Sequence, residues 1–294
     1  MPAYRTLFLS DLHLGMRGCQ SERLLDFVRT HDAERWLLVG DVVDGWALMR
    51  NWRWPAEHTA VLMALLDKVR AGAEVVYVPG NHDGAVRPFA GLAFGGVRVE
   101  RDLVHTTADG RRLLVLHGDE FDGALRYAPW VSRLGAQLYE LALWANTWVS
   151  ARRARKGKGY WSLAGALKAR TKAVVQYVGR FEDAVAARAV DEGVDGVVCG
   201  HIHHAELRDV SPTLVYANCG DWVESCTALA EHPDGHLELV RWTDGSEPDR
   251  PEARRHPTSR PAHTRRAHAR LPLAVEAHMG DGAASAPPSL PSLS

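Results

Sequence analysis

The sequence predicts an α/β protein in which helices and sheets form layers. Short apolar runs that end in polar residues or glycine alternate with segments whose apolar residues have helical spacing. This alternation is typical of layered α/β domains. The chain has 294 residues, of which 46% are hydrophobic and 24% are charged, so it can bury a large core and has an ordinary globular composition.

Four strands and two helices are predicted within residues 5–118. The strands are the apolar runs RTLFLS (5–10), WLLVG (36–40), EVVYVPG (74–80) and RLLVLHG (112–118). Between them, residues 20–31 and 55–71 carry apolar groups at helical spacing. In the stretch TTADGRRLLVLHG, Asp109 and Gly110 form the predicted turn of a hairpin.

Residues 122–190 have a different pattern, which predicts a helical insertion in the α/β core. Apolar residues from Leu134 to Trp148 recur on one helical face. The strand pattern then returns in three runs, at 195–204, 213–222 and 236–242. The expected organisation is a core of residues 1–121 and 191–244, a helical cap of residues 122–190, and a disordered tail of residues 245–294 that is rich in Pro, Ala, Ser, Arg and His.

Composition and charge exclude several classes of protein. The net charge of −1 argues against a polyanion-binding protein. The four cysteines form no CxxC pair, which predicts unpaired thiols in a reducing compartment. Asp11 and His13 interrupt the first apolar stretch, so no signal peptide is predicted, and no segment offers about 20 uninterrupted apolar residues. We therefore expect a cytoplasmic protein.

Metal-binding side chains follow five of the predicted strands. The motifs are DLH at 11–13, GDVVD at 40–44, GNHD at 80–83, HGD at 117–119 and GHIH at 200–203. In layered α/β domains, ligands bind at the carboxyl ends of strands. Each histidine alone is best interpreted as an ordinary polar loop residue, but the five motifs together predict one site where these strands end.

The chemistry of these donors predicts a site for two divalent ions. Asp11 with His13, and His201 with His203, stand at i and i+2, so each pair can face the same side of an extended segment. Carboxylates, imidazoles and an amide without thiolate suit Mn²⁺, Fe²⁺ or Zn²⁺. Seven donors suit two ions about 3.5–4 Å apart with one bridging carboxylate, an arrangement that activates water for phosphate ester hydrolysis. They are Asp11, His13, Asp41, Asn81, His117, His201 and His203.

The order DxH, GDxxD, GNHD, HGD and GHxH resembles the calcineurin-like metallophosphoesterase superfamily over about residues 5–242. The resemblance implies a four-layer α/β/β/α sandwich and two divalent ions, with manganese expected and iron or zinc as alternatives. It implies that one ion is held by Asp11, His13, Asp41 and His203. The other is held by Asn81, His117, His201 and the bridging Asp41.

Within the superfamily, SDLHLG, GDVVDGW and the helical insertion are most similar to the UDP-2,3-diacylglucosamine pyrophosphatase family of lipid A biosynthesis. That resemblance implies cleavage of a nucleotide–lipid diphosphate by a metal-activated water. The sequence departs from the family at His82, where an Arg is typical, and at Asp44-Gly45, where Glu-Ala is favoured. A phosphodiesterase of soluble nucleotides or nucleic-acid ends, and a non-catalytic scaffold with this fold, are the alternative functions.

His82 and Asp83 are the predicted catalytic residues. Because His82 directly follows a metal ligand, we expect its side chain to diverge from the ions and to reach the phosphoryl group or the leaving oxygen. There an imidazole can donate a proton, and Asp83 or Asp44 would hold its tautomer. The alternative interpretation is that His82 only caps a turn.

The predicted cap is basic, whereas the rest of the core is acidic. Lys and Arg outnumber Asp and Glu in residues 122–180, and five of them lie between 152 and 158 near several aromatic residues. Basic and aromatic groups on amphipathic helices suit an anionic membrane surface. We therefore expect peripheral contact with the inner membrane face and no nucleic-acid partner. The alternative is a solvated helical hairpin that only packs on the core.

A lipid-linked phosphate ester is the expected substrate. Arg17 and Arg50 are expected to meet a second phosphate. Trp46, Trp52 and Trp54 would ordinarily be core residues, but at the rim of the site they could contact a base or an acyl chain. The predicted substrate contacts are Arg17, Asp44, Trp46, Arg50, Tyr160, Lys168 and Lys172.

Overall fold

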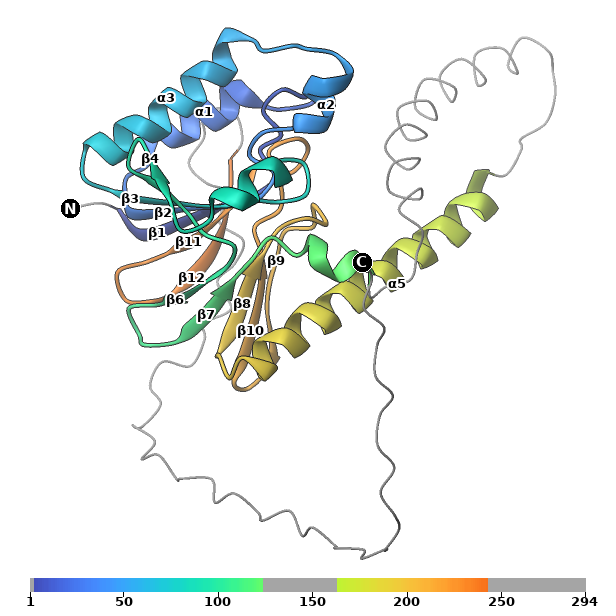
Figure 1. The fold of residues 1–294 in the computed structure, drawn as a ribbon. Helices are drawn as coiled ribbons and strands as arrows, with labels where there is room; N and C mark the ends of the chain where they lie inside the picture. Colours follow the sequence, from blue (N-terminus) through green and yellow to red (C-terminus); the bar gives the residue numbers. More distant parts are fainter. Residues whose placement is uncertain (1–2, 124–162, 243–294) are drawn as a thin grey trace, which may run out of the picture. The chain divides into compact units, whose positions relative to one another are not determined.

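The computed structural model describes residues 3–123 and 163–242, which contain two mixed β-sheets (Figure 1). The seven-stranded sheet has the order β12-β11-β1-β2-β3-β5-β4. Its strands are β1 (Tyr4–Leu9), β2 (Ala33–Val39), β3 (Glu74–Val78), β4 (Ala93–Phe94), β5 (Val97–Val99), β11 (Thr227–Glu231) and β12 (Leu237–Arg241). The five-stranded sheet has the order β6-β7-β8-β10-β9. Its strands are β6 (Leu103–Thr106), β7 (Arg112–Val115), β8 (Gly196–Cys199), β9 (Glu206–Ser211) and β10 (Leu214–Asn218).

Helices cover the outer face of each sheet. The helices α1 (Ser21–Thr30) and α3 (Ala56–Arg70) pack on the seven-stranded sheet, where Phe27 and Val61 share a buried cluster with Trp36. Helix α5 (Leu163–Asp191) packs on the five-stranded sheet through Phe181 and Val185. The short helices are α2 (Gly45–Arg50) and the 3₁₀ helices η1 (Gly84–Phe89) and η2 (Asp119–Gly123).

The inner faces of the two sheets form a third buried cluster. Phe8, Leu37 and Val76 of the first sheet pack with Val115 and Val198 of the second. Strands β1 and β2 are therefore buried on both faces, which explains why they read as continuous apolar runs. The layers are helix, sheet, sheet and helix, so the predicted α/β/β/α sandwich is confirmed.

Parallel strands place the predicted ligands at one edge of the sandwich. Strands β1, β2 and β3 are parallel neighbours in the first sheet, as are β7, β8 and β10 in the second. The polar motifs DLH, GDVVD and GNHD follow the ends of β1, β2 and β3, and HGD and GHIH follow β7 and β8. The carboxyl ends of five strands thus meet at one edge.

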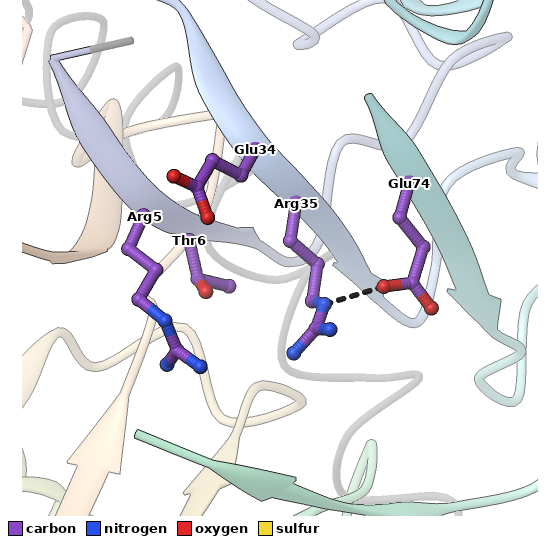
Figure 2. Close-up of a pocket in the computed structure, with 5 residues that line it drawn as sticks. All are labelled: Arg5, Thr6, Glu34, Arg35 and Glu74. Atoms are coloured by element: carbon purple, nitrogen blue, oxygen red, sulfur yellow. Dashed lines mark hydrogen bonds and ion pairs between the residues drawn. The ribbon is translucent and has the colours of Figure 1, made fainter. Parts of the chain in front are cut away.

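The opposite edge carries compensated surface charges. Figure 2 shows a small pocket at the amino ends of β1, β2 and β3, where Arg35 donates from Nε to Oε2 of Glu74 at 2.5 Å. Arg5 pairs with the buried Glu231 through Nη1 and Oε1, which are also 2.5 Å apart. The two arginines at this edge are therefore already engaged by carboxylates.

The elements agree with the sequence patterns where those patterns are long. The predicted strands at 5–10, 36–40, 74–80 and 112–118 are β1, β2, β3 and β7, and the predicted helices are α1 and α3. Strands β4 and β5 have two and three residues and carry no period of their own. The predicted tail of residues 245–294 and residues 124–162 of the predicted cap lie outside the described residues. In the part of the chain that the structure describes, no helix has the length and apolar character needed to cross a bilayer.

Replacing Phe8 by Ala should lower the free energy of unfolding by about 3–5 kcal/mol, because the ring is fully buried between the two sheets. Urea denaturation followed by circular dichroism measures this change. Phe94→Ala is the control, since that ring is 54% exposed on β4 and its loss should alter stability by about 0.5 kcal/mol or less. Equal losses for the two variants would contradict the inter-sheet role of Phe8.

Candidate metal centre

Five of the seven predicted ligands lie in turns with an unusual backbone conformation. Five of the six non-glycine residues with positive φ in the described parts of the chain are predicted ligands. They are Asp11 (54°), His13 (49°), Asp41 (52°), His201 (71°) and His203 (52°). We expected extended i, i+2 pairs, but these residues adopt the left-handed conformation, which turns the chain sharply after each strand. Such residues cost about 1–3 kcal/mol each and cluster at functional sites.

Glycines leave the space into which the ligand side chains turn. A Cβ at Gly40 would overlap the ring of His117, and Gly40 has a φ of 82°. A Cβ at Gly80 would overlap the carboxylate of Asp41 and would lie 2.6 Å from Nε2 of His117. The glycines of the second and third motifs are therefore required by close packing around His117.

Asp11, His13 and His203 converge on one point. Nε2 of His203 lies 3.2 Å from Oδ1 of Asp11 and 3.2 Å from Nε2 of His13. Nε2 of His13 lies 3.8 Å from the same carboxylate oxygen. That oxygen of Asp11 is buried and has no hydrogen-bond partner. A buried carboxylate oxygen without a partner, faced by two imidazole nitrogens, fits a divalent cation.

Asp41 lies at the centre of the cluster. Its Oδ2 is 3.4 Å from Nε2 of His117 and 3.9 Å from Nε2 of His13. Its Oδ1 accepts a hydrogen bond of 2.8 Å from the backbone N–H of His82. Oδ1 of Asn81 lies 3.3 Å from Nε2 of His117. Asp41 therefore has candidate donors on both sides of it.

Hydrogen bonds outside the cluster orient two of the imidazoles. Nδ1 of His13 is 3.2 Å from Oδ2 of Asp44, and Nδ1 of His117 is 3.0 Å from the carbonyl oxygen of Val39. Both partners are acceptors, so each Nδ1 carries a proton and each Nε2 is the nitrogen that a metal ion can bind once it is deprotonated. Metal-binding histidines in proteins are commonly held in this way.

The cluster attracts positive charge. Burial alone would raise the pKa of Asp11, but His203, His117 and His13 hold it well below its usual range. Burial would lower the pKa of His117, whereas Asp41 and Asp11 raise it to about 10. In the same way Asp11 raises the pKa of His203 to about 9 against the effect of burial. Protons on these imidazoles thus occupy the electrostatic place of a cation.

His201 lies beside the cluster, but one of its ring nitrogens is engaged elsewhere. Its backbone N–H donates to Oδ2 of Asp11 at 3.0 Å, and its ring centroid is 5.2 Å from that of His117. Its Nε2 lies 3.0 Å from Oδ1 of Asp122 in η2. Sequence reasoning missed Asp122, although the stretch HGDEFD places a third carboxylate five residues after His117.

The ring of His82 lies closer to the cluster than predicted. We expected it to diverge from the ligands, but its Nε2 is 3.9 Å from Oδ2 of Asp41, and it forms a possible metal-binding group with His13 and Asp41. Trp46 of α2 covers the ring at a centroid distance of 4.0 Å, and His13 contacts it edge-on at 4.7 Å. Nδ1 is 3.0 Å from Oδ1 of Asp44, an ion-pair distance. These neighbours hold the ring against the cluster.

Asp83 has other contacts than those predicted for it, and Asp44, which lies near His82 as predicted, is buried. Asp83 is 5% exposed, and its oxygens accept from the backbone N–H groups of Gly80 and Val42 and from the hydroxyl of Tyr77. Burial raises its pKa, and Asp83 holds the GNHD turn rather than His82. Asp44, predicted to contact substrate, is 1% exposed; it caps α2 and orients His13.

The remaining predicted substrate contacts divide into two groups. Arg17 and Arg50 are exposed, and Trp46 is partly buried at the rim of the cluster. Beside them, Met49 is 80% exposed and Trp52 is 77% exposed, so the surface around α2 is both apolar and cationic. Tyr160 and the side chains of Lys168 and Lys172 lie outside the described residues.

The fold and the donors define a metallophosphoesterase, a sandwich with a cluster of carboxylates and imidazoles at the strand ends. The family described as calcineurin-like phosphoesterase matches residues 4–205, a range that contains all five ligand motifs. The chain belongs to this family, so the superfamily predicted from the motifs is confirmed. Membership supports a metal-dependent phosphoester hydrolase.

Solved structures of low identity are also similar to the chain. YfcE, a phosphoesterase from E. coli, is 15% identical, with 81% of this chain and 99% of that chain covered and a TM-score of 0.36. Wild-type Vps29 from Entamoeba histolytica in complex with zinc is 17% identical, with 83% and 97% covered and a TM-score of 0.40. Similarities at this level carry no argument about function. No curated protein is significantly similar to the chain.

The metal-free protein should lose stability as the pH rises from 6.5 toward 9. In the folded state the pKa values of His117 and His203 lie above the usual value of 6.5, so protonation stabilises the fold. This contribution is complete below pH 6.5 and is lost as the pH passes about 9 and about 10. Urea denaturation of chelator-treated protein at several pH values measures the slope.

The exposed His204 supplies the control for this experiment. His204→Gln should keep the slope of stability against pH, whereas His203→Gln should reduce it. Saturation with a divalent ion should also remove the slope, because a bound ion replaces the protons. A stability that stays constant or rises over this range in the metal-free protein would contradict the assignment.

Proposed function

We propose that the protein hydrolyses a phosphodiester or diphosphate bond with two divalent ions, manganese in the first place. The observation that carries this proposal is the convergence of three imidazoles, those of His13, His82 and His117, on Oδ2 of the buried Asp41, with the buried Asp11 beside them. One ion would be held by Asp11, His13, His203 and Asp41, and the other by Asp41, Asn81, His117 and His201. When bound, such ions activate a water and neutralise phosphoryl oxygens.

His82 is the residue of this chain that we assign to the leaving group. Its Nε2 faces the cluster beside Oδ2 of Asp41, and its side chain is 22% exposed, so a substrate can reach it. Packing against Trp46, with the two ring planes at 34° to one another, restricts the orientation of the ring, and Asp44 lies next to Nδ1. An imidazole held in this way can donate a proton to the oxygen that leaves phosphorus.

The substrate that we propose is a nucleotide-linked glycolipid such as UDP-2,3-diacylglucosamine. The exposed Met49 and Arg50 are the last two residues of α2, whose Trp46 covers His82, and the exposed Trp52 follows the helix. An acyl chain would find apolar contacts on this surface and a second phosphate would find a cation. Peripheral contact with an anionic membrane, which presents such lipids, belongs to the same proposal.

Hydrolysis of three substrates by manganese-loaded protein tests the proposal. They are UDP-2,3-diacylglucosamine, a soluble cyclic dinucleotide and bis-p-nitrophenyl phosphate, each with and without detergent micelles. The proposal expects metal-dependent cleavage of all activated esters and highest efficiency with the glycolipid in micelles. Preference for the dinucleotide without dependence on detergent would support the soluble-nucleotide alternative. If protein that retains its metal cleaves none of the three substrates, the remaining alternative is a non-catalytic scaffold.

Asp41→Ala should remove most activity and at least one metal ion, because a bridging carboxylate serves both ions. Elemental analysis of the purified variant, together with its turnover, measures both effects. Asp183→Ala on the exposed surface of α5 is the matched control and should keep metal and activity. Retention of two ions with near-normal turnover by Asp41→Ala would exclude the bridging role.

His82→Ala should lower kcat by roughly 10²–10⁴-fold on an ester with a poor leaving group while the metal content is unchanged. With a p-nitrophenyl ester the loss should be much smaller, because that leaving group needs no proton. An equal loss of kcat on both esters would exclude proton donation by His82 and would leave electrostatic stabilisation as its role. Loss of a metal ion would instead assign His82 as a ligand, as its position beside His13 and Asp41 permits.

A further inference from the structure

We infer that Asp122 and Tyr177 are positioning residues that hold the ring of His201 so that Nδ1, and not Nε2, is its metal-binding atom. This inference rests on the proposed two-ion site, and it concerns a carboxylate to which the ligand motifs assign no role. It follows from three contacts: a hydrogen bond on Nε2, a second hydrogen bond on the same carboxylate, and the packing of α5 against the ring.

The hydrogen bond on Nε2 determines which nitrogen is free. Nε2 of His201 lies 3.0 Å from Oδ1 of Asp122. An ionised carboxylate only accepts hydrogen bonds, so Nε2 carries the proton and Nδ1 has the lone pair. His13 and His117 show the same logic with the nitrogens exchanged, since their Nδ1 atoms donate to Asp44 and to the carbonyl of Val39. His201 thus differs from those two ligands in the nitrogen that it offers.

The second hydrogen bond fixes the carboxylate. The hydroxyl of Tyr177 donates to the same Oδ1 of Asp122 at 2.7 Å. Asp122 is in η2, directly after the HGD motif, whereas Tyr177 is on α5, so the carboxylate is held from two elements. Outer partners of this kind fix the orientation of metal-binding histidines in proteins.

Packing from α5 completes the support. Phe181 stands four residues after Tyr177, on the same face of the helix, and is fully buried. Its ring centroid is 5.9 Å from that of His201, and Phe121 of η2 contacts it at 6.4 Å. The ring of His201 therefore lies between His117 and Phe181 and is held at its edge by Asp122.

The opposite interpretation makes a contrary prediction. If Nε2 of His201 were the metal-binding atom, Asp122 would compete with the ion, and removing the carboxylate would tighten metal binding. If Asp122 positions the ring, removing the carboxylate weakens the binding of one ion. The direction of the change in affinity decides between the two.

Calorimetric titration of metal-free protein with Mn²⁺ measures that direction. The wild-type protein should bind two ions, and Asp122→Ala should bind one of them about 10–100-fold more weakly. Asp122→Asn should recover part of the loss, because its amide oxygen still accepts from Nε2, and Tyr177→Phe should show a smaller loss. Glu120→Gln is the matched control, since it removes a carboxylate from η2 that contacts Arg188 and not His201.

A spectroscopic measurement gives a readout that a purely structural role would not produce. Nitrogen-detected NMR of the imidazoles in zinc-loaded protein should show one ligand bound through Nδ1, and His201→Gln should remove that signal. Binding of His201 through Nε2, unchanged or tighter affinity in Asp122→Ala, or binding of only one ion by the wild type would overturn the inference. Metal binding without hydrolysis would refute the proposed function and leave this assignment intact.

Discussion

Two carboxylates buried side by side impose the main constraint on this molecule. Asp11 is 0% exposed and Asp41 is 2% exposed, and with His117 they offer ligand atoms within 4.8 Å of one another. Buried negative charges need compensation. Backbone N–H groups supply part of it, from His201 to Asp11 and from His82 to Asp41. The imidazoles around them supply the rest when protonated, and divalent cations would supply more.

Asp44 links the candidate acid to the metal ligands. One of its oxygens lies 3.2 Å from Nδ1 of His13 and the other 3.0 Å from Nδ1 of His82. The same buried carboxylate therefore neighbours a predicted ligand on one side and the proposed proton donor on the other. Asp44 therefore holds the rings of His13 and His82 on either side of one carboxylate.

Much of the fold and of the donor set could be predicted because both follow from residue types along long apolar runs. The apolar runs that form β1, β2 and β3 are followed by Asp11, Asp41 and Asn81, and the strand order of the sheet brings these donors together. Other features had no such signal. The left-handed backbone of His13 cannot be predicted from its residue type. The two-residue strand β4 is too short to show an alternation of apolar and polar residues.

The roles of Asp83 and Asp122 depend on neighbouring groups whose positions cannot be predicted from the sequence. Asp83 was predicted as a partner for His82, but its oxygens accept hydrogen bonds from the backbone N–H groups of Gly80 and Val42 instead. Asp122 stood in a stretch assigned to the cap, and only the approach of α5 through Tyr177 gives it a partner near His201. Turn geometry and helix placement, rather than residue type, decided these cases.

The left-handed conformation of the ligand residues bears on how such a protein can change over time. Glycine adopts a positive φ without penalty, and asparagine tolerates it better than most residues. A descendant that no longer bound metal would gain stability by replacing His13, Asp41 or His203 with either of them. Selection for stability alone would therefore erase the donors. Their presence in this chain favours a lineage in which the site still carries out its chemistry.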